Sequence, residues 1–193
     1  MLGNNVTAII LAAGESKRMG RNKLSLPYKG IPLIQYTFQL VDKIDFLKCI
    51  VVISPKNVEE LVGVSFPKEA KIIYNFHPEL GQSHSVVLGT KEAKGEGYLF
   101  FVGDQPLLTE EIIEEMLANA AADRIIYPLK EEGKTSNPTF FGRDFREDLI
   151  GIQGEAGGRQ IREKYPQACY SFTPKDVKQL KDIDTMRDLE ELV

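Results

Sequence analysis

The stretch "VTAIILAAGESKRMGRNKL", residues 6–24, decides the fold. It begins with the continuous apolar run 6–12, passes through the small residues Ala12, Ala13 and Gly14, and then gathers four cations. A run of this length without polar alternation is typical of a strand that is buried on both faces, as in a parallel sheet covered by helices. Such sheets bind ligands beyond the carboxyl ends of their strands. We therefore expect the turn at 12–14 to line a ligand site.

Further apolar runs alternate with helical patterns along the chain. The expected strands are 49–54, 71–75, 98–103 and 124–129, and the expected helices are 32–44, 83–94 and 109–122. Alternation of this kind builds βαβ units. The sequence thus predicts the α/β class: a single Rossmann-like three-layer domain over residues 1–193 with a mostly parallel central sheet. After residue 130 the chain is rich in turn residues and glycine, and we expect a smaller insertion that closes over the sheet.

Capping signals mark where several helices begin. Pro32 suits the first turn of a helix, because its fixed φ and missing N–H are tolerated there. Thr109 is a suitable N-cap, and Glu110 and Glu111 after it favour the positive end of a helix. Near the C-terminus, "TMRD" at 185–188 has the spacing of a capping box and predicts one more short helix.

Composition and charge exclude several classes of protein. The net charge of −4 and the pI near 5.4 argue against a nucleic-acid binder with a basic stripe. No apolar run approaches the ~18 residues of a membrane span, and no basic segment followed by an apolar one marks a secretory signal. Cys49 and Cys169 lie too far apart to suggest a zinc motif or a disulfide framework. We expect a cytoplasmic protein that binds neither nucleic acid nor a membrane.

The cations after the first apolar run indicate an anion site. Backbone N–H groups of a small-residue turn can bind a phosphate, and Lys17, Arg18, Arg21 and Lys23 add donors that suit a triphosphate. The spacing excludes a Walker A loop, because Gly14 is followed five positions later by Met19, and the G-x-G-x-x-G fingerprint is also missing. A solvated basic loop is the alternative interpretation.

Carboxylates provide a second possible part of the site. Asp104 follows the apolar run 98–103 directly, and would lie beside the first turn if 6–12 and 98–103 are neighbouring strands. One or two carboxylates together with substrate phosphates are the usual ligands of Mg²⁺. On spacing alone, an ordinary turn aspartate before Gln-Pro explains the same residue slightly better. Asp182 and Asp184 form a later pair, of which either could complete a metal site.

Taken together, the motifs resemble the nucleotidyltransferase superfamily that includes the molybdenum cofactor cytidylyltransferases and guanylyltransferases, with a glycosyltransferase-A-like fold. The signature "LAAGESKRMGRNKLSLPYKGIPLIQYT" at 11–37 carries most of the similarity, and "GQSHSV" at 81–86, "GDQPLL" at 103–108 and "DIDTMRDL" at 182–189 follow in the family's order. The similarity covers nearly the whole chain. It implies a Mg²⁺-dependent (or Mn²⁺-dependent) enzyme that transfers a nucleotide from an NTP to a phosphorylated acceptor and releases pyrophosphate.

The resemblance also implies roles for individual residues. The catalytic residues would be Arg18 and Lys23, which match the family's phosphate-binding cations, and Asp104, which matches its metal ligand. Asp184 is the preferred second ligand, and Lys17 and Arg21 become solvated neighbours. The nucleotide would contact these three catalytic residues together with Leu11, Ala12, Ala13, Gly14, Gln82 and Ser83.

The nucleotide and the acceptor are less fully specified. The turn reads Leu-Ala-Ala-Gly, which resembles the cytidylyl branch, whereas Leu-Ala-Gly-Gly marks the guanylyl branch, so Ala13 favours CTP over GTP. On the acceptor side "SNP" stands where cytidylyl members often carry Gly-His-Pro, and "GEAGGR" where they often carry Gly-Asp-x-Gly-Ala-Arg. Asn137, Glu155 and Arg159 are the acceptor-binding candidates in these segments. The expected acceptor is molybdopterin, with a molybdoenzyme or its chaperone as a further partner; the alternatives are a sugar-phosphate acceptor and a non-catalytic nucleotide-binding chaperone.

Overall fold

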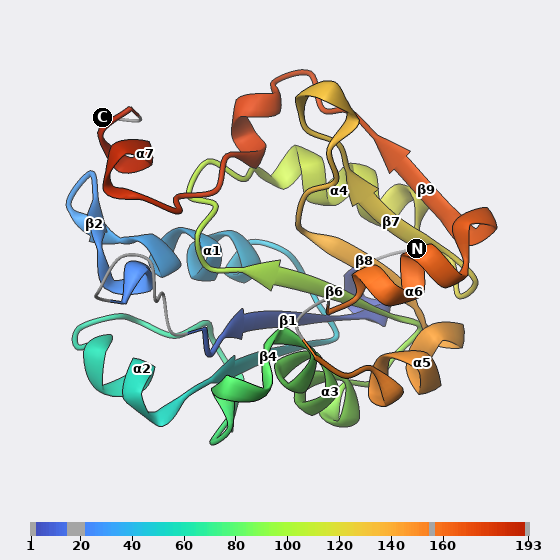
Figure 1. Ribbon diagram of the computed structural model, residues 1–193, viewed down its shortest axis with the longest axis horizontal. Helices are drawn as coiled ribbons and strands as arrows, with labels where there is room; N and C mark the ends of the chain where they lie inside the picture. The colour runs from blue at the N-terminus through green and yellow to red at the C-terminus, as the bar shows by residue number, and fades with distance from the viewer. Residues whose placement is uncertain (1–2, 15–21, 155–156, 192–193) are drawn as a thin grey trace.

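A computed structural model of the chain describes residues 3–14, 22–154 and 157–191 (Figure 1). Its main sheet has seven strands in the order β5-β4-β1-β6-β8-β7-β9, and β2 and β3 form a separate two-stranded sheet. The strands are β1 Val6–Ala12, β2 Pro27–Tyr28, β3 Ile31–Pro32, β4 Lys48–Ile53, β5 Lys71–Tyr74, β6 Gly97–Val102, β7 Ile125–Pro128, β8 Thr139–Gly142 and β9 Cys169–Phe172. The helices are α1 Leu33–Asp42, α2 Pro55–Glu60, α3 Gln82–Glu92, α4 Glu110–Asn119, α5 Arg146–Gly151, α6 Arg159–Lys164 and α7 Met186–Glu190.

The parallel half of the sheet is built around β1. This strand pairs in parallel with β4 on one side and β6 on the other, and β5 extends the sheet beyond β4. In the register of β1 and β6, Leu11 lies opposite Val102, so the two strands end next to each other. The turn at 12–14 and Asp104 therefore emerge at the same edge of the sheet.

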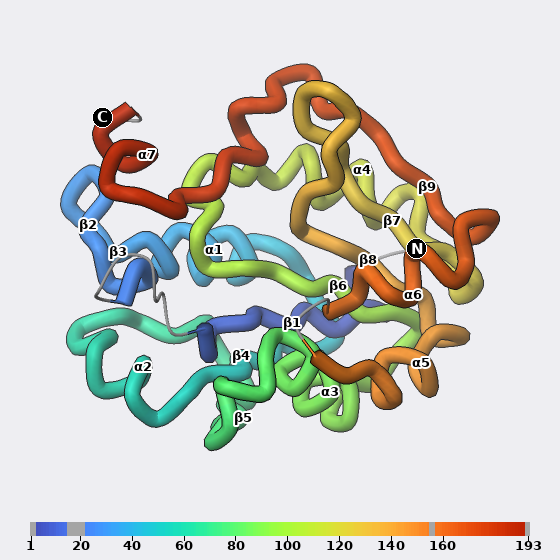
Figure 2. Tube along the Cα trace, in the orientation of Figure 1, coloured from blue at the N-terminus to red at the C-terminus, as the bar shows by residue number. Residues whose placement is uncertain are grey.

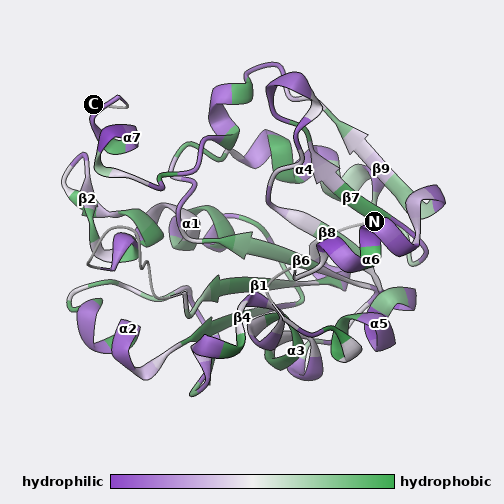
Figure 3. Cartoon of the chain, viewed as in Figure 1, coloured by the Kyte–Doolittle hydropathy of each residue, from purple (hydrophilic) through white to green (hydrophobic). Residues whose placement is uncertain are grey.

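Two apolar clusters cover the two faces of the sheet and make three layers. On one face Phe38 of α1 and Met116 of α4 pack against strand residues such as Ile10. On the other face Val86 of α3 and Leu149 of α5 pack against the opposite side of the strands. The central strands are mainly hydrophobic in Figure 3, as is typical of strands buried on both faces. The expected α/β class with a mostly parallel central sheet is confirmed.

The chain after residue 130 contributes more to the sheet than its composition indicates. Besides turns it supplies β8, which lies antiparallel between β6 and β7, and β9, which pairs in parallel with β7. Each of these strands has four residues. The sequence prediction of an insertion did not include these two strands, because neither contains valine, isoleucine or leucine: β8 reads Thr-Phe-Phe-Gly and β9 reads Cys-Tyr-Ser-Phe.

The helix ends follow the capping signals closely. Thr109 is the N-cap of α4, and Thr185 with Asp188 forms the expected capping box of α7. Pro32 stands one position earlier than expected, as the N-cap of α1. Helix α7 lies beside the β2–β3 hairpin (Figure 2), where Leu26, Ile183 and other apolar residues form a third cluster. None of the helices in the described ranges is long and apolar enough to cross a membrane.

Candidate nucleotide and metal site

A residue of α2 is hydrogen-bonded to the turn after β1. Asn57 Nδ2 donates hydrogen bonds to the carbonyl oxygens of Ala12, at 2.7 Å, and Gly14, at 3.0 Å. Asn57 is buried in the first turn of α2, which begins at the N-cap Ser54. The amide thus fixes the conformation of the turn through its carbonyl groups. Sequence reasoning missed Asn57, although the Ser-Pro signal at 54–55 marks a helix start directly after β4.

A lysine bridges two carboxylates beside this turn. Lys23 Nζ lies 2.5 Å from Asp104 Oδ2 and 2.9 Å from Asp184 Oδ1. The Lys23 and Asp104 side chains are 20% and 13% exposed, whereas Asp184 is 53% exposed. This arrangement places three of the expected site residues together. It also separates the closing aspartates, because Asp184 faces Lys23 while Asp182 forms an ion pair with Lys130.

Burial and charge shift the pKa values of both Lys23 and Asp104. Burial raises the pKa of Asp104, even though the Lys23 ammonium group acts in the opposite direction. Burial alone would lower the pKa of Lys23, but the Asp104 and Asp184 carboxylates outweigh it and raise that pKa. Lys23 is therefore charged at neutral pH, and its ammonium group lies between two carboxylates. Burial of the Asp104 carboxylate makes its ionised form costly.

Close packing explains how residues so distant in sequence meet. A Cβ atom on Gly103 would lie 2.8 Å from Leu24 Cδ2 and 3.0 Å from Ile34 Cγ1, so glycine here lets both side chains pack closely against the residue after β6. This contact brings the neighbours Lys23 and Asp104 together. On the other side, the Ile183 N–H donates to the Asp104 carbonyl oxygen at 2.9 Å and positions Asp184.

One oxygen of Asp104 lies in surroundings that suit a divalent cation. Asp104 Oδ1 is buried and accepts no hydrogen bond from the described residues. A buried carboxylate oxygen without a donor is costly unless a cation or another donor reaches it. The described residues include no group of three or more His, Cys, Asp or Glu side chains that could hold a metal. Mg²⁺ sites commonly use one or two carboxylates together with substrate phosphates, and Asp104 and Asp184 supply that number.

The middle loop lies at the start of α3. Gln82 is exposed there, whereas Ser83 is buried and its Oγ accepts a hydrogen bond from the Gly157 N–H at 3.2 Å. The Ser83 N–H in turn donates to the Gly154 carbonyl oxygen at 3.3 Å. Ser83 thus connects α3 to the glycine-rich segment before α6. In this structure it positions a neighbouring loop, while Gln82 remains accessible to a ligand.

Of the three acceptor-binding candidates, the structure describes Asn137 and Arg159. Asn137 precedes β8 and lines a pocket together with Leu11 and Gln82. Arg159 is 70% exposed, and its Nε donates to Glu163 Oε1 at 2.7 Å. The remaining expected residues, Arg18 and Glu155 with Lys17 and Arg21, lie outside the described residues.

The "SNP" segment at 136–138 is attached to the "GDQPLL" segment at 103–108 by one side chain. Gln105, which follows Asp104, is buried, and its Nε2 donates to Ser136 Oγ and to the Leu180 carbonyl oxygen, each at 3.1 Å. Gln105 therefore joins the end of β6 to the approach to β8. No local sequence pattern marks this contact, because it depends on the antiparallel placement of β8.

Fold and site together define a class. A small-residue turn, a lysine and two carboxylates at the carboxyl edge of an α/β sheet can bind a polyphosphate and a divalent cation, as expected of a nucleotidyltransferase. The sequence profile of the family described as "MobA-like NTP transferase domain" matches residues 8–169. The chain belongs to this family of nucleotidyltransferases.

Individual relatives carry different names. The purine catabolism protein PucB of Bacillus subtilis is 27% identical, over 94% of this chain and 93% of that protein. A probable molybdenum cofactor guanylyltransferase of Trichormus variabilis is 33% identical, over 83% of this chain and 76% of its own length. Among solved structures, Rv0371c of Mycobacterium tuberculosis in complex with manganese matches with a TM-score of 0.81 at 18% identity, covering 97% of each chain. That structural likeness supports the fold.

Proposed function

We propose that this protein transfers CMP from CTP to the phosphate of a molybdopterin-type acceptor and releases pyrophosphate. The observation that carries the proposal is Lys23 held between Asp104 and Asp184 beside the turn at 12–14. An oxygen of the acceptor phosphate bonds to the α-phosphorus of the nucleotide, and the bond from that phosphorus to the bridging oxygen of the β-phosphate breaks. A phosphate is already ionised at neutral pH, so the reaction requires no general base from the chain.

The residues of the site act by binding and by charge. Asp104 and Asp184 would hold Mg²⁺ or Mn²⁺, and a bound ion supplies charge neutralisation at the phosphates. Lys23 offsets the negative charge that grows on the departing pyrophosphate. The backbone of 12–14, fixed by Asn57, offers N–H groups to the phosphates. Positioning and electrostatics of this kind supply most of the catalysis in phosphoryl chemistry.

The choice of CTP rests on the second alanine of the turn. Ala13 is 2% exposed, so its methyl group packs inside the protein and acts on the nucleobase only through the backbone of the turn. GTP is the alternative, because the Trichormus relative is named a guanylyltransferase. The accessible amide of Gln82 can donate to and accept from either base.

A thermal-shift screen of the four NTPs with Mg²⁺ tests the nucleotide. A ligand at 100 times its Kd stabilises the native state by about 2.7 kcal/mol, which corresponds to a rise in Tm of roughly 5–10 °C for a chain of this size. We expect CTP to give the largest shift and molybdopterin to elicit pyrophosphate release. A larger shift with GTP would reassign the nucleotide, and binding without pyrophosphate release would favour the non-catalytic chaperone.

Gly14→Ala tests close approach of the nucleotide to the turn. A Cβ atom at Gly14 meets no atom of the described residues within 4 Å, so the fold itself tolerates alanine there. We expect an unchanged Tm without ligand. Affinity for the NTP should fall by about 10- to 100-fold, since displacing one charge-assisted hydrogen bond costs about 1.5–3 kcal/mol. Isothermal titration with the nucleotide measures the loss.

Gly151→Ala is the matched control for this variant. A Cβ at Gly151 also meets nothing within 4 Å in the described structure, but this residue lies at the end of α5. Its substitution should leave NTP affinity unchanged. Equal affinities of the two variants would show that the nucleotide does not approach Gly14 closely.

A further inference from the structure

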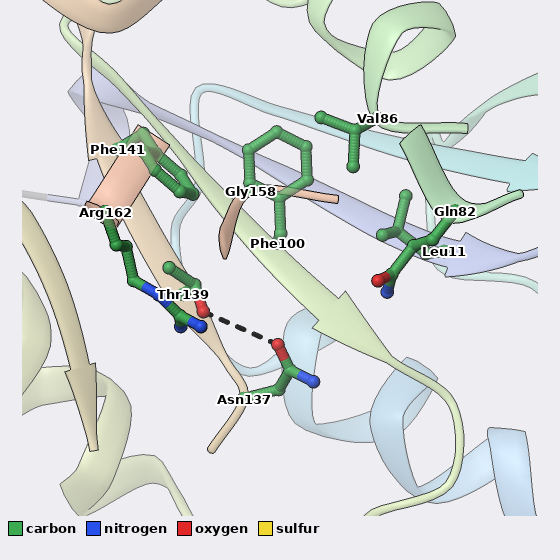
Figure 4. Close-up of a pocket in the computed structure, with 9 residues that line it drawn as sticks. All are labelled: Leu11, Gln82, Val86, Phe100, Asn137, Thr139, Phe141, Gly158 and Arg162. Carbon is green, nitrogen blue, oxygen red and sulfur yellow. Dashed lines mark hydrogen bonds between the residues drawn. The ribbon is translucent and has the colours of Figure 1, made fainter. Parts of the chain in front are cut away.

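A pocket opens on the α3 side of the sheet, next to the site but formed largely by other residues. It is open to solvent, with a cavity volume of about 50 Å³. Apolar and polar side chains both line it. The lining residues are Leu11, Gln82, Val86, Phe100, Asn137, Thr139, Phe141, Gly158 and Arg162 (Figure 4). Pockets with an apolar wall and a few polar groups are the usual form of small-molecule sites.

Arg162 is the one charged side chain among these lining residues, and no sequence motif pointed to it. It belongs to α6 and lies half-buried, with its guanidinium carbon 4.8 Å from the centre of the Tyr127 ring. In Figure 4 the guanidinium group reaches toward Thr139 and Asn137, and Gln82 lies across the pocket. The ring of Tyr127 thus holds the guanidinium group in a fixed orientation.

The charge of Arg162 is poorly compensated within the described part of the chain. Its hydrogen bond there is a long one, from Nη2 to Thr135 Oγ1 at 3.5 Å, and no described carboxylate forms an ion pair with it. The nearby Glu163 is engaged by Arg159. Burial lowers the pKa of Arg162, as expected for a cation that has lost water without gaining an anion.

The neighbouring amide has unused hydrogen-bonding capacity as well. Asn137 Oδ1 accepts a hydrogen bond from Thr139 Oγ1 at 3.4 Å, and no hydrogen bond from Asn137 Nδ2 to another described residue is seen. In Figure 4 the oxygen of the Asn137 amide faces Thr139 and its nitrogen points away from the guanidinium group. Both donor groups line the pocket, and such donors suit an oxyanion joined to an apolar or aromatic body.

We propose that Arg162, assisted by Asn137, binds the phosphate of the acceptor and that the apolar wall takes the body that carries it. The proposal rests on the proposed nucleotidyl transfer, for which it assigns the acceptor subsite and its ligand class: a phosphate monoester on a flat ring system. Gln105, which follows Asp104, donates a hydrogen bond to Ser136, which precedes Asn137, so the segments that carry the two sites are attached to each other.

Binding of phenyl phosphate to the unmodified protein and to Arg162→Met tests the proposal without requiring turnover. Methionine keeps the apolar packing of the arginine stem and removes the donors. We expect phenyl phosphate to bind more tightly than either inorganic phosphate or phenol. Arg162→Met should weaken its binding by about 10- to 100-fold, the usual effect of losing a charged hydrogen-bonding pair. Isothermal titration at fixed ionic strength measures all three probes.

Two further variants make the result specific. Lys164→Met removes an exposed cation of the same helix, which pairs with Asp148, and should leave phenyl phosphate affinity unchanged. Arg162→Lys keeps the charge without the planar fork and should lose only part of the affinity. Equal affinity of Arg162→Met and the unmodified protein, or an equal loss in Lys164→Met, would overturn the assignment.

Kinetics separate this proposal from the proposed function. In Arg162→Met the KM for the acceptor should rise by about 10- to 100-fold while the KM for the nucleotide stays constant. If the unmodified protein releases no pyrophosphate with any NTP and acceptor, the proposed function fails, and the titrations still decide whether Arg162 binds phosphate esters. If turnover is normal and the acceptor KM is unchanged in Arg162→Met, the subsite alone is wrong.

Discussion

Asp104→Asn is expected to lower the rate of nucleotidyl transfer by about 10²–10³, the usual effect of removing one group that stabilises charge in a transition state. The substitution keeps the size of the side chain but removes the buried anion that faces Lys23 and carries the donor-free Oδ1. Single-turnover measurement of pyrophosphate release, at saturating nucleotide and metal, isolates the chemical step. Near-normal turnover would exclude Asp104 as the essential metal ligand.

The same variant changes stability in two opposing ways. Burial raises the pKa of Asp104, so its ionised form is disfavoured in the native state relative to the unfolded chain. A carboxyl group with a raised pKa opposes folding at pH values above its unfolded pKa, and asparagine removes this cost. It also takes from Lys23 the carboxylate that does most to raise the pKa of Lys23, and with it part of the stability that the charged lysine contributes. We therefore expect Tm at neutral pH to change little while activity is lost, and a cooperative melt shows that the lost rate does not come from unfolding.

Asp182→Asn is the matched control for this prediction. Asp182 belongs to the same closing segment, but its carboxylate pairs with Lys130 and not with Lys23. Its substitution should change the rate by no more than a few-fold. A loss as large as that of Asp104→Asn would show that Asp182, and not Asp184, completes the metal site.

The sequence predicts the centre of this fold better than its edges. Strand β1 has the expected bounds because an unbroken run of seven apolar or small residues has the length and composition of a strand that is buried on both faces. The sequence does not predict β8 or β9, because Thr-Phe-Phe-Gly and Cys-Tyr-Ser-Phe lack the adjacent isoleucines that mark the equally short β5 and β7. Their place in the sheet follows from long-range pairing, in which β8 runs antiparallel between β6 and β7.

In the candidate site, too, the sequence predicts some residues and not others. Lys23, Asp104 and Asp184 stand in motifs of fixed spacing, and the structure brings their side chains together. Asn57 and Arg162 have no such spacing, because their roles arise from where α2 and α6 meet the rest of the fold. Contacts between distant segments, rather than local pattern, decide which polar side chain faces a ligand.

Lys23→Met is the second substitution with a large expected effect, a loss of about 10²–10³ in transfer rate, because it removes the cation that offsets charge on the leaving pyrophosphate. It should also change how the protein binds a metal in the absence of nucleotide. Lys23 now occupies Asp104 Oδ2 and Asp184 Oδ1, so a divalent ion must compete with its ammonium group for both carboxylates. Removing that competitor should tighten Mn²⁺ binding, which electron paramagnetic resonance titration measures.

Stability supplies an independent readout for the same variant. The carboxylates raise the pKa of Lys23, so its charged form stabilises the native state at every pH below its unfolded pKa, and this contribution is lost as pH rises through the folded pKa. Lys23→Met should therefore lower Tm at neutral pH, where two carboxylates lose their shared cation, and Mn²⁺ should restore it more than it raises Tm of the unmodified protein. Lys130→Met, which leaves the Lys23 pairs intact, should show neither tighter Mn²⁺ binding nor a slower transfer. Mn²⁺ affinity in Lys23→Met no higher than in the unmodified protein would mean that the ion takes its ligands elsewhere, and that the lysine bridge lies beside the metal site and not within it.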